Sequence, residues 1–167
     1  MQATVVYFSV SGKNEQMAKA LDRDLREKGH NSVLVFLKPR RLVGVIGSVL
    51  LSVFSRPLEL SEDYGAVEGD LLVLVGPVWA SSINPVTRAF LNQLKDLGGM
   101  RAINLVCGFS PHPNVVRQIN RKLKEHHAGK IVSRPVRLRD IDSYDKMMAL
   151  SDELIKEVTQ TSAESNA

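Results

Sequence analysis

The feature that most constrains the fold is a regular alternation of short apolar runs with longer segments of helical periodicity. The runs are rich in β-branched residues and predict five strands, at residues 4–8, 32–37, 71–75, 103–107 and 131–138. Apolar residues recur every three or four positions in the segments between and after them, which predicts helices at residues 14–28, 85–97, 114–126 and 142–158. Strands that alternate with helices indicate an α/β, doubly wound parallel sheet with helices on both faces. The last three runs are nearly continuous, as expected for strands buried on both faces.

The chain is long enough for one such domain. Its 167 residues are 44% hydrophobic, which excludes a disordered chain. We expect the domain to span residues 1–158, with an apolar insertion at about residues 40–60. Residues 159–167 are small and polar, and we expect a flexible tail there.

Composition excludes several kinds of chemistry. The single cysteine, Cys107, rules out an intramolecular disulfide framework and a cysteine-rich zinc or iron–sulfur site, and no histidine–carboxylate pattern indicates a metal. No secretory signal is visible at the start, so we expect a cytoplasmic protein. The net charge of +4 is modest, and nucleic acid is not an expected partner.

Ligands of doubly wound sheets bind at the carboxyl ends of the strands. The segment after the first strand, residues 9–14, places hydroxyls and a glycine at a predicted helix start, where free N–H groups favour a phosphate. A plain strand-to-helix turn with a polar cap is the alternative. A nucleotide P-loop is excluded, because Tyr7 and Asn14 stand where a glycine and a Ser or Thr are required.

Two further segments follow strands at the same edge. Residues 77–85 contain Trp79, the only tryptophan, between two prolines in what we predict to be a loop. Its ring could form a flat wall for a planar ligand or simply cap the core. Residues 108–114 contain His112, which could donate a proton to a substrate or be an ordinary loop residue.

These segments resemble the flavodoxin family, specifically its short, five-stranded type. Ser-Val-Ser-Gly-Lys-Asn at residues 9–14 is similar to the Thr/Ser-x-Thr/Ser-Gly-Asn-Thr phosphate loop of that family. Residues 77–81, with Pro85 and residues 88–91, are similar to its second flavin loop and the helix that follows. The resemblance covers most of the chain outside the insertion and the tail. It implies a flavodoxin-like five-stranded sheet of order 2-1-3-4-5 that holds one FMN.

By this resemblance, the first segment would hold the FMN phosphate, Trp79 would stack on the isoalloxazine ring, and the third segment would flank its other side. The implied FMN-binding residues are Ser9, Ser11, Gly12, Lys13, Asn14, Pro77, Val78, Trp79, Ala80, Ser81, Ser82, Gly108, Phe109 and Ser110. Two of them depart from the family. Lys13 replaces the usual Asn, and Ser81 replaces a common Gly, which would cost roughly 1 kcal/mol or more wherever the loop requires a positive φ. The basic charge also departs from the acidic character of flavodoxins that shuttle electrons.

Three functions remain open at this stage. The first is an FMN-binding electron carrier that exchanges electrons with a redox partner protein. The second is an FMN-dependent NAD(P)H:quinone-type reductase with a small acceptor, and the third is a cofactor-less interaction domain. A phosphorelay receiver is excluded, because the first and third predicted strands do not end in carboxylates.

Two surface features each allow more than one role. The nearly uncharged residues 42–55 are too short for a membrane span of ~20 residues. They could pack on their own domain, form a homodimer contact, or contact a lipid or quinone peripherally. Arg117, Arg121 and Lys124 share a predicted helical face, which is either a solvated surface or a site for an anionic partner.

Overall fold

The computed structural model describes residues 1–41, 57–79 and 81–160, and its elements follow the predicted alternation. In chain order they are β1 (Gln2–Tyr7), α1 (Lys13–Glu27), β2 (Asn31–Phe36), β3 (Leu71–Trp79), β4 (Ser82–Ile83), α3 (Pro85–Gln93), β5 (Arg101–Gly108), α4 (Pro113–Glu125), β6 (Ile131–Arg137), the 3-10 helix η1 (Leu138–Ile141) and α5 (Tyr144–Thr159). The apolar segment 42–55, Ala80 and tail residues 161–167 lie outside the described residues.

Five parallel strands form the sheet in the order β2-β1-β3-β5-β6. Numbered by their succession along the chain, these strands have the predicted order 2-1-3-4-5. A sixth strand, the two-residue β4, pairs antiparallel with the end of β3 through Val78–Ile83 and Trp79–Ser82. This small hairpin was not predicted.

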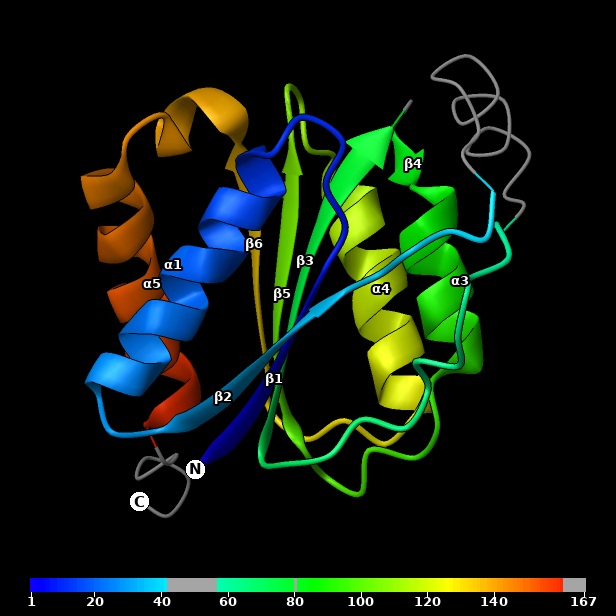
Figure 1. The fold of residues 1–167 in the computed structure, drawn as a ribbon, viewed down its shortest axis with the longest axis horizontal. Coiled ribbons are helices and arrows are strands. Elements are labelled where there is room, and N and C mark those ends of the chain that lie inside the picture. The colour runs from blue at the N-terminus through cyan, green and yellow to red at the C-terminus, as the bar shows by residue number, and fades with distance from the viewer. Residues whose placement is uncertain (42–56, 80, 161–167) are drawn as a thin grey trace.

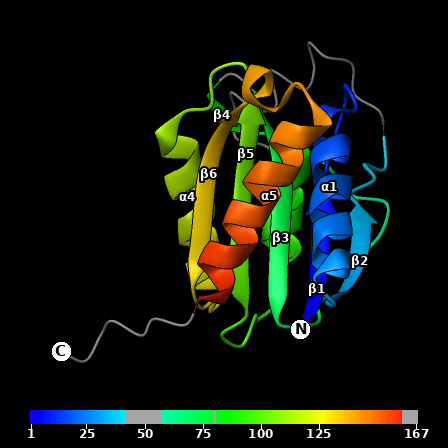
Figure 2. The same ribbon diagram turned by 90° about the vertical axis from the view of Figure 1, so that its left-hand side faces the viewer.

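Helices cover both faces of the sheet, as Figures 1 and 2 show. Helices α1 and α5 pack on one face, and α3 and α4 pack on the other. Each interface is a separate apolar cluster, because alternate side chains of the central strands point to opposite faces. The interior strand β5 is buried along almost its whole length.

Strand β6 corrects one expectation. Residues 131–138 were expected to be buried on both faces, but β6 is an edge strand whose Pro135 and Arg137 are exposed. An edge strand tolerates a proline, since one of its sides has no neighbour that needs the missing N–H. The apolar run reflects the buried side chains of Val132 and Val136 and the partly buried side chains of Ile131 and Leu138.

Helix α3 is shorter than its apolar periodicity predicts. It ends at Gln93, and Leu94 takes up an extended conformation with ψ 129°. The chain leaves the helix here because Lys95 N–H bonds to the Gly65 carbonyl and the Gln93 side chain accepts from Tyr64 N–H. Leu94 and Leu97 stay buried without being helical.

The parallel strands all end at the same edge, which Figure 1 shows at the top. The β1–α1 loop, the β3–β4 hairpin and the β5–α4 loop meet there, while the N-terminus lies at the opposite edge. Among the described residues, no helix has both the length and the apolar character needed to cross a bilayer.

Candidate functional site

The β1–α1 loop leaves donor groups free at the start of a long helix. Gly12 precedes α1 with φ 81°, a left-handed conformation that favours glycine, and no side chain in the described part of the chain caps the helix. The space beside Gly12 is open, since a Cβ built there would have no atom within 4 Å. The first N–H groups of α1 therefore lack a side-chain acceptor, and the helix dipole favours an anion beside them.

Two side chains of this loop carry a buried oxygen that has no hydrogen-bond partner among the described residues, Ser9 Oγ and Asn14 Oδ1. The Ser9 hydroxyl is buried and finds no hydrogen-bond partner among the described residues. Asn14 is also buried, and its Nδ2 donates to the Phe8 carbonyl at 3.1 Å, which ties the first turn of α1 to the end of β1. A buried hydroxyl without a partner costs about 1–3 kcal/mol. An anion that accepts a hydrogen bond from the Ser9 hydroxyl would remove this cost.

The second predicted loop is in part a strand. Pro77, Val78 and Trp79 continue β3, and the chain then turns back into β4. Trp79 packs against the core yet stays partly exposed, and its ring and that of Phe8 form a T-shaped pair with a centroid distance of 6.1 Å and an interplanar angle of 70°. At the turn, Ser81 has φ 55° and carries the left-handed strain expected of a non-glycine residue. The hairpin thus lies directly beside the β1–α1 loop.

The third loop follows β5. Gly108 is buried close to β3, since a Cβ built on it would lie 3.5 Å from the Val78 Cβ. Phe109 and Ser110 are exposed, Phe109 to 93%. His112 caps α4, because its Nδ1 accepts from the Asn114 N–H at 3.2 Å. The sheet therefore brings all three predicted segments to one edge.

Of the comparisons with known proteins, the one with solved structures bears on the architecture. No family model matches the sequence, and no curated protein matches it. Among solved structures, an oxidised flavodoxin 1 from Bacillus cereus has a TM-score of 0.62 at 18% identity over 95% of this chain and 100% of that chain. A flavodoxin from Streptococcus pneumoniae TIGR4 has a TM-score of 0.59 at 14% identity over 95% and 100%.

This chain has the flavodoxin fold. The fold that the resemblance implies is confirmed. Identities of 14% and 18% show the fold alone and not the function. In this flavodoxin fold the ligand-binding edge predicted from the sequence is where the three loops meet. The role of each predicted FMN-binding residue stays a prediction.

Sequence reasoning missed the residue that holds the hairpin of this flavodoxin fold in place. Asn84 is buried, and its Oδ1 accepts from the N–H groups of Val86 and Thr87 at 3.1 and 2.9 Å. Its Nδ2 donates to the Pro77 carbonyl at 2.8 Å and to Thr87 Oγ1 at 2.6 Å. Asn84 thus caps α3 and clamps β3 to it. Asparagine directly before proline at a helix start was the available signal.

Arg88 is a second residue that sequence reasoning missed, and in its case no local pattern gives a signal. From α3 it reaches back to the hairpin, where Nη2 donates to Ser82 Oγ at 3.1 Å and to the Ile83 carbonyl at 3.4 Å. Burial lowers the pKa of the Arg88 guanidinium. A partly buried cation on α3 therefore holds the β4 end of the hairpin through hydrogen bonds.

Aromatic residues gather at the same edge. Phe36, at the end of β2, lies 5.4 Å from Tyr7 and 6.3 Å from Phe8 between ring centroids, and Phe8 in turn contacts Trp79. Phe36 is 43% exposed and Val10 is 63% exposed. Apolar side chains exposed beside an anion-favouring helix start suit a ligand with one charged end and one planar, apolar end. Cys107 takes no part, because burial raises the pKa of its thiol to about 12.

Proposed function

We propose that this protein binds one FMN non-covalently at the carboxyl edge of its sheet and takes part in electron transfer. The observation that carries the proposal is the buried Ser9 hydroxyl, which has no hydrogen-bond partner among the described residues, beside the start of α1, which no described side chain caps. A helix start with free donors is a ready site for a phosphate monoester. The partly exposed Trp79 on the adjacent hairpin offers a wall for a planar ring.

The residues divide into those that would hold the phosphate and those that would hold the ring. Ser9, Ser11, Gly12 and Lys13 surround the start of α1, and Asn14 shapes this loop through its bond to the Phe8 carbonyl. Residues 77–82 and 108–110 would lie on either side of the ring. When bound, FMN supplies the redox chemistry, and the protein supplies position, stacking and the local field.

The proposal of electron transfer is supported by the solved structures to which this fold is similar. The solved structures named above are flavodoxins, and a further one is a two-electron reduced flavodoxin of Megasphaera elsdenii, with a TM-score of 0.56 at 14% identity over 90% of this chain and 98% of that chain. We propose a redox protein as the partner and the cytoplasm as the location. The unpaired Cys107 is compatible with a reducing compartment.

An FMN titration with a matched pair of variants tests the proposal. Ser9 and Ser32 each bury a hydroxyl that has no partner among the described residues, but Ser32 lies at the start of β2, at the opposite edge of the sheet. We expect quenching of FMN fluorescence with a Kd below about 1 μM. Ser9→Ala should weaken binding about tenfold, as for a lost hydrogen bond to a charged group, and Ser32→Ala should leave it unchanged.

Three results would contradict the proposal in different ways. Absence of FMN binding would remove the cofactor and leave an interaction domain. Binding that is accompanied by rapid bleaching with NADPH and turnover of a quinone would replace the carrier with a reductase. Equal effects of the two serine substitutions would place the phosphate elsewhere.

A further inference from the structure

The two helical layers differ in charge. Helices α1 and α5 together carry six cations and eight carboxylates, whereas α3 and α4 carry five cations and one carboxylate. Four of those five cations lie on α4, within the nine residues from Arg117 to Glu125. The modest net charge of the chain therefore conceals a basic face formed mainly by one helix.

Ion pairing also differs between the layers. On the α1 and α5 side, five of the six helix cations have a carboxylate partner four residues away, such as Lys19–Glu15 at 2.6 Å and Lys146–Asp142 at 2.8 Å. On α4, Arg121 and Lys122 share the single carboxylate of Glu125, at 3.7 and 2.8 Å.

The other two cations of α4 have no carboxylate partner among the described residues. Arg117 hydrogen-bonds to the Asn114 amide oxygen, and Lys124 forms no ion pair within the described part of the chain. The helix dipole favours cations in the last turn, which accounts for Lys124. It does not account for Arg117, near the helix start.

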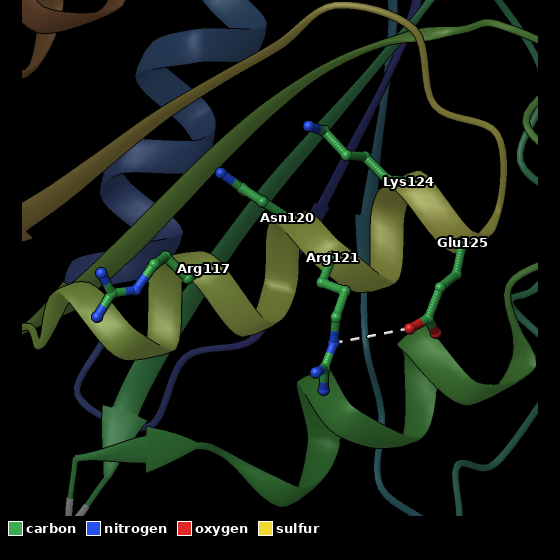
Figure 3. A pocket seen from close by; sticks show the side chains of 5 residues that line it. All are labelled: Arg117, Asn120, Arg121, Lys124 and Glu125. Carbon is green, nitrogen blue, oxygen red and sulfur yellow. Dashed lines mark ion pairs between the residues drawn. The ribbon is translucent and has the colours of Figure 1, made fainter.

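These side chains line a shallow groove of about 560 Å³, formed by Arg117, Asn120, Arg121, Lys124 and Glu125. Figure 3 shows Asn120 and Lys124 extending from one side of α4, and Arg121 with Glu125 from the other. A second hollow of about 240 Å³ continues the groove toward the start of the helix, past Asn114 and Gln118.

Asn120 is held as a donor in this groove. Its Oδ1 accepts from Asn104 Nδ2 at 3.0 Å and from Ser133 Oγ at 2.7 Å, and Asn104 is fully buried. These two bonds fix the orientation of the Asn120 amide, so that its Nδ2 is the group that can donate a hydrogen bond to a ligand in the groove. The apolar face of α4 is buried separately, through Val115, Ile119 and Leu123.

We infer that this basic face of α4 docks an acidic surface of the protein with which electrons are exchanged. The inference rests on the proposed function, since α4 begins directly after the loop of residues 108–112 at the proposed FMN edge. From Asn114 to Lys124 the helix extends about 15 Å, a length that a row of carboxylates on one helix or strand of a partner can match. RNA is disfavoured because α4 offers no aromatic side chain for base stacking.

A binding assay with a defined acidic probe tests the inference. The probe is a fluorescent peptide of about ten residues, half of them Glu, which in extended form spans the helix face. Anisotropy is measured with the full chain at about 10 mM and again at about 150 mM salt, because the Debye length falls from about 30 to about 8 Å. Measurements with and without FMN keep this test independent of cofactor binding.

Two triple variants with equal loss of charge separate position from net charge. The first variant neutralises the basic face of α4 and carries R117Q, R121Q and K124Q. The second neutralises cations of the opposite layer and carries K19Q, R23Q and K146Q. We expect the first to weaken peptide binding about tenfold and the second less than twofold. Should the first triple variant fail to fold, R117Q and K124Q alone should each weaken binding about threefold.

Three results would overturn the inference. Equal weakening by both triple variants would show attraction by net charge alone. Failure of the unsubstituted protein to bind the peptide at low salt would remove the docking surface. Tighter binding of a single-stranded RNA of equal charge, lost in the α4 variant, would assign the face to nucleic acid.

Discussion

Replacing Asn84 with Ala should destabilise the protein more than any ordinary cap mutation. The substitution removes the cap of α3, which costs about 1 kcal/mol. It also removes two donated bonds at about 1 kcal/mol each, to the partly buried Pro77 carbonyl and to the buried Thr87 Oγ1, and leaves both acceptors without this partner. The free energy of unfolding should therefore fall by about 3 kcal/mol.

Urea unfolding of three variants separates these contributions. Asn84→Asp keeps an acceptor for the two N–H groups of α3 and loses the donor to Pro77, so we expect a loss of about 1–2 kcal/mol. Ser143→Ala removes the cap of α5, whose Oγ accepts from Lys146 N–H at 3.4 Å, and should cost about 1 kcal/mol or less. The α5 variant is the control for a cap that lies outside the hairpin.

The same variants connect stability to the site. Asn84→Ala frees the hairpin that carries Trp79, so we expect FMN to bind about tenfold more weakly, whereas Ser143→Ala should leave FMN affinity unchanged. A loss of stability below about 1 kcal/mol for Asn84→Ala would refute the argument that Asn84 clamps β3 to α3.

Three further predictions follow from single groups. Ser81→Gly should raise the free energy of unfolding by about 0.5–1 kcal/mol, because Ser81 has φ 55°, and a decrease in urea unfolding would contradict this. Cys107 should resist iodoacetamide at about pH 8 in the native protein and react in urea, because burial raises its pKa to about 12; rapid native labelling would argue against burial. The Lys146 hydrogen bond lowers the pKa of Asp142, so stability present at neutral pH should decline below about pH 5, and less steeply in Asp142→Asn.

Much of the architecture follows from local sequence patterns. Runs such as residues 71–75 and 103–107 predict central strands because both of their faces are buried, and the order of the parallel strands follows from the alternation with helices. The binding edge follows as well, since the carboxyl ends of parallel strands meet at one edge.

Pro77 shows why the hairpin could not be predicted. Gly76 and Pro77 together are typical of a turn, yet β3 continues through both. The pairing of β3 with β1 ends at Val75, so beyond that point one side of β3 has no parallel neighbour. A proline is tolerated there, and β5 still pairs on the other side through Cys107.

The remaining differences between the sequence-based prediction and the structure arise from tertiary contacts. The end of α3 depends on the segment around Gly65, which is distant in sequence, and the bond from Arg88 to Ser82 depends on how the hairpin turns back. The unpaired hydroxyl of Ser9 likewise depends on what surrounds it in the fold. Residue spacing alone contains none of this information.

The most direct test of the central claim is an amide NMR titration of the full chain with FMN. If FMN binds at the carboxyl edge, the largest shift changes should fall in residues 9–14, 78–82 and 108–110, at the start of α1 and in the two neighbouring loops. Shift changes confined to α4 or to the outer faces of α1 and α5, or no change at all in excess FMN, would contradict the account.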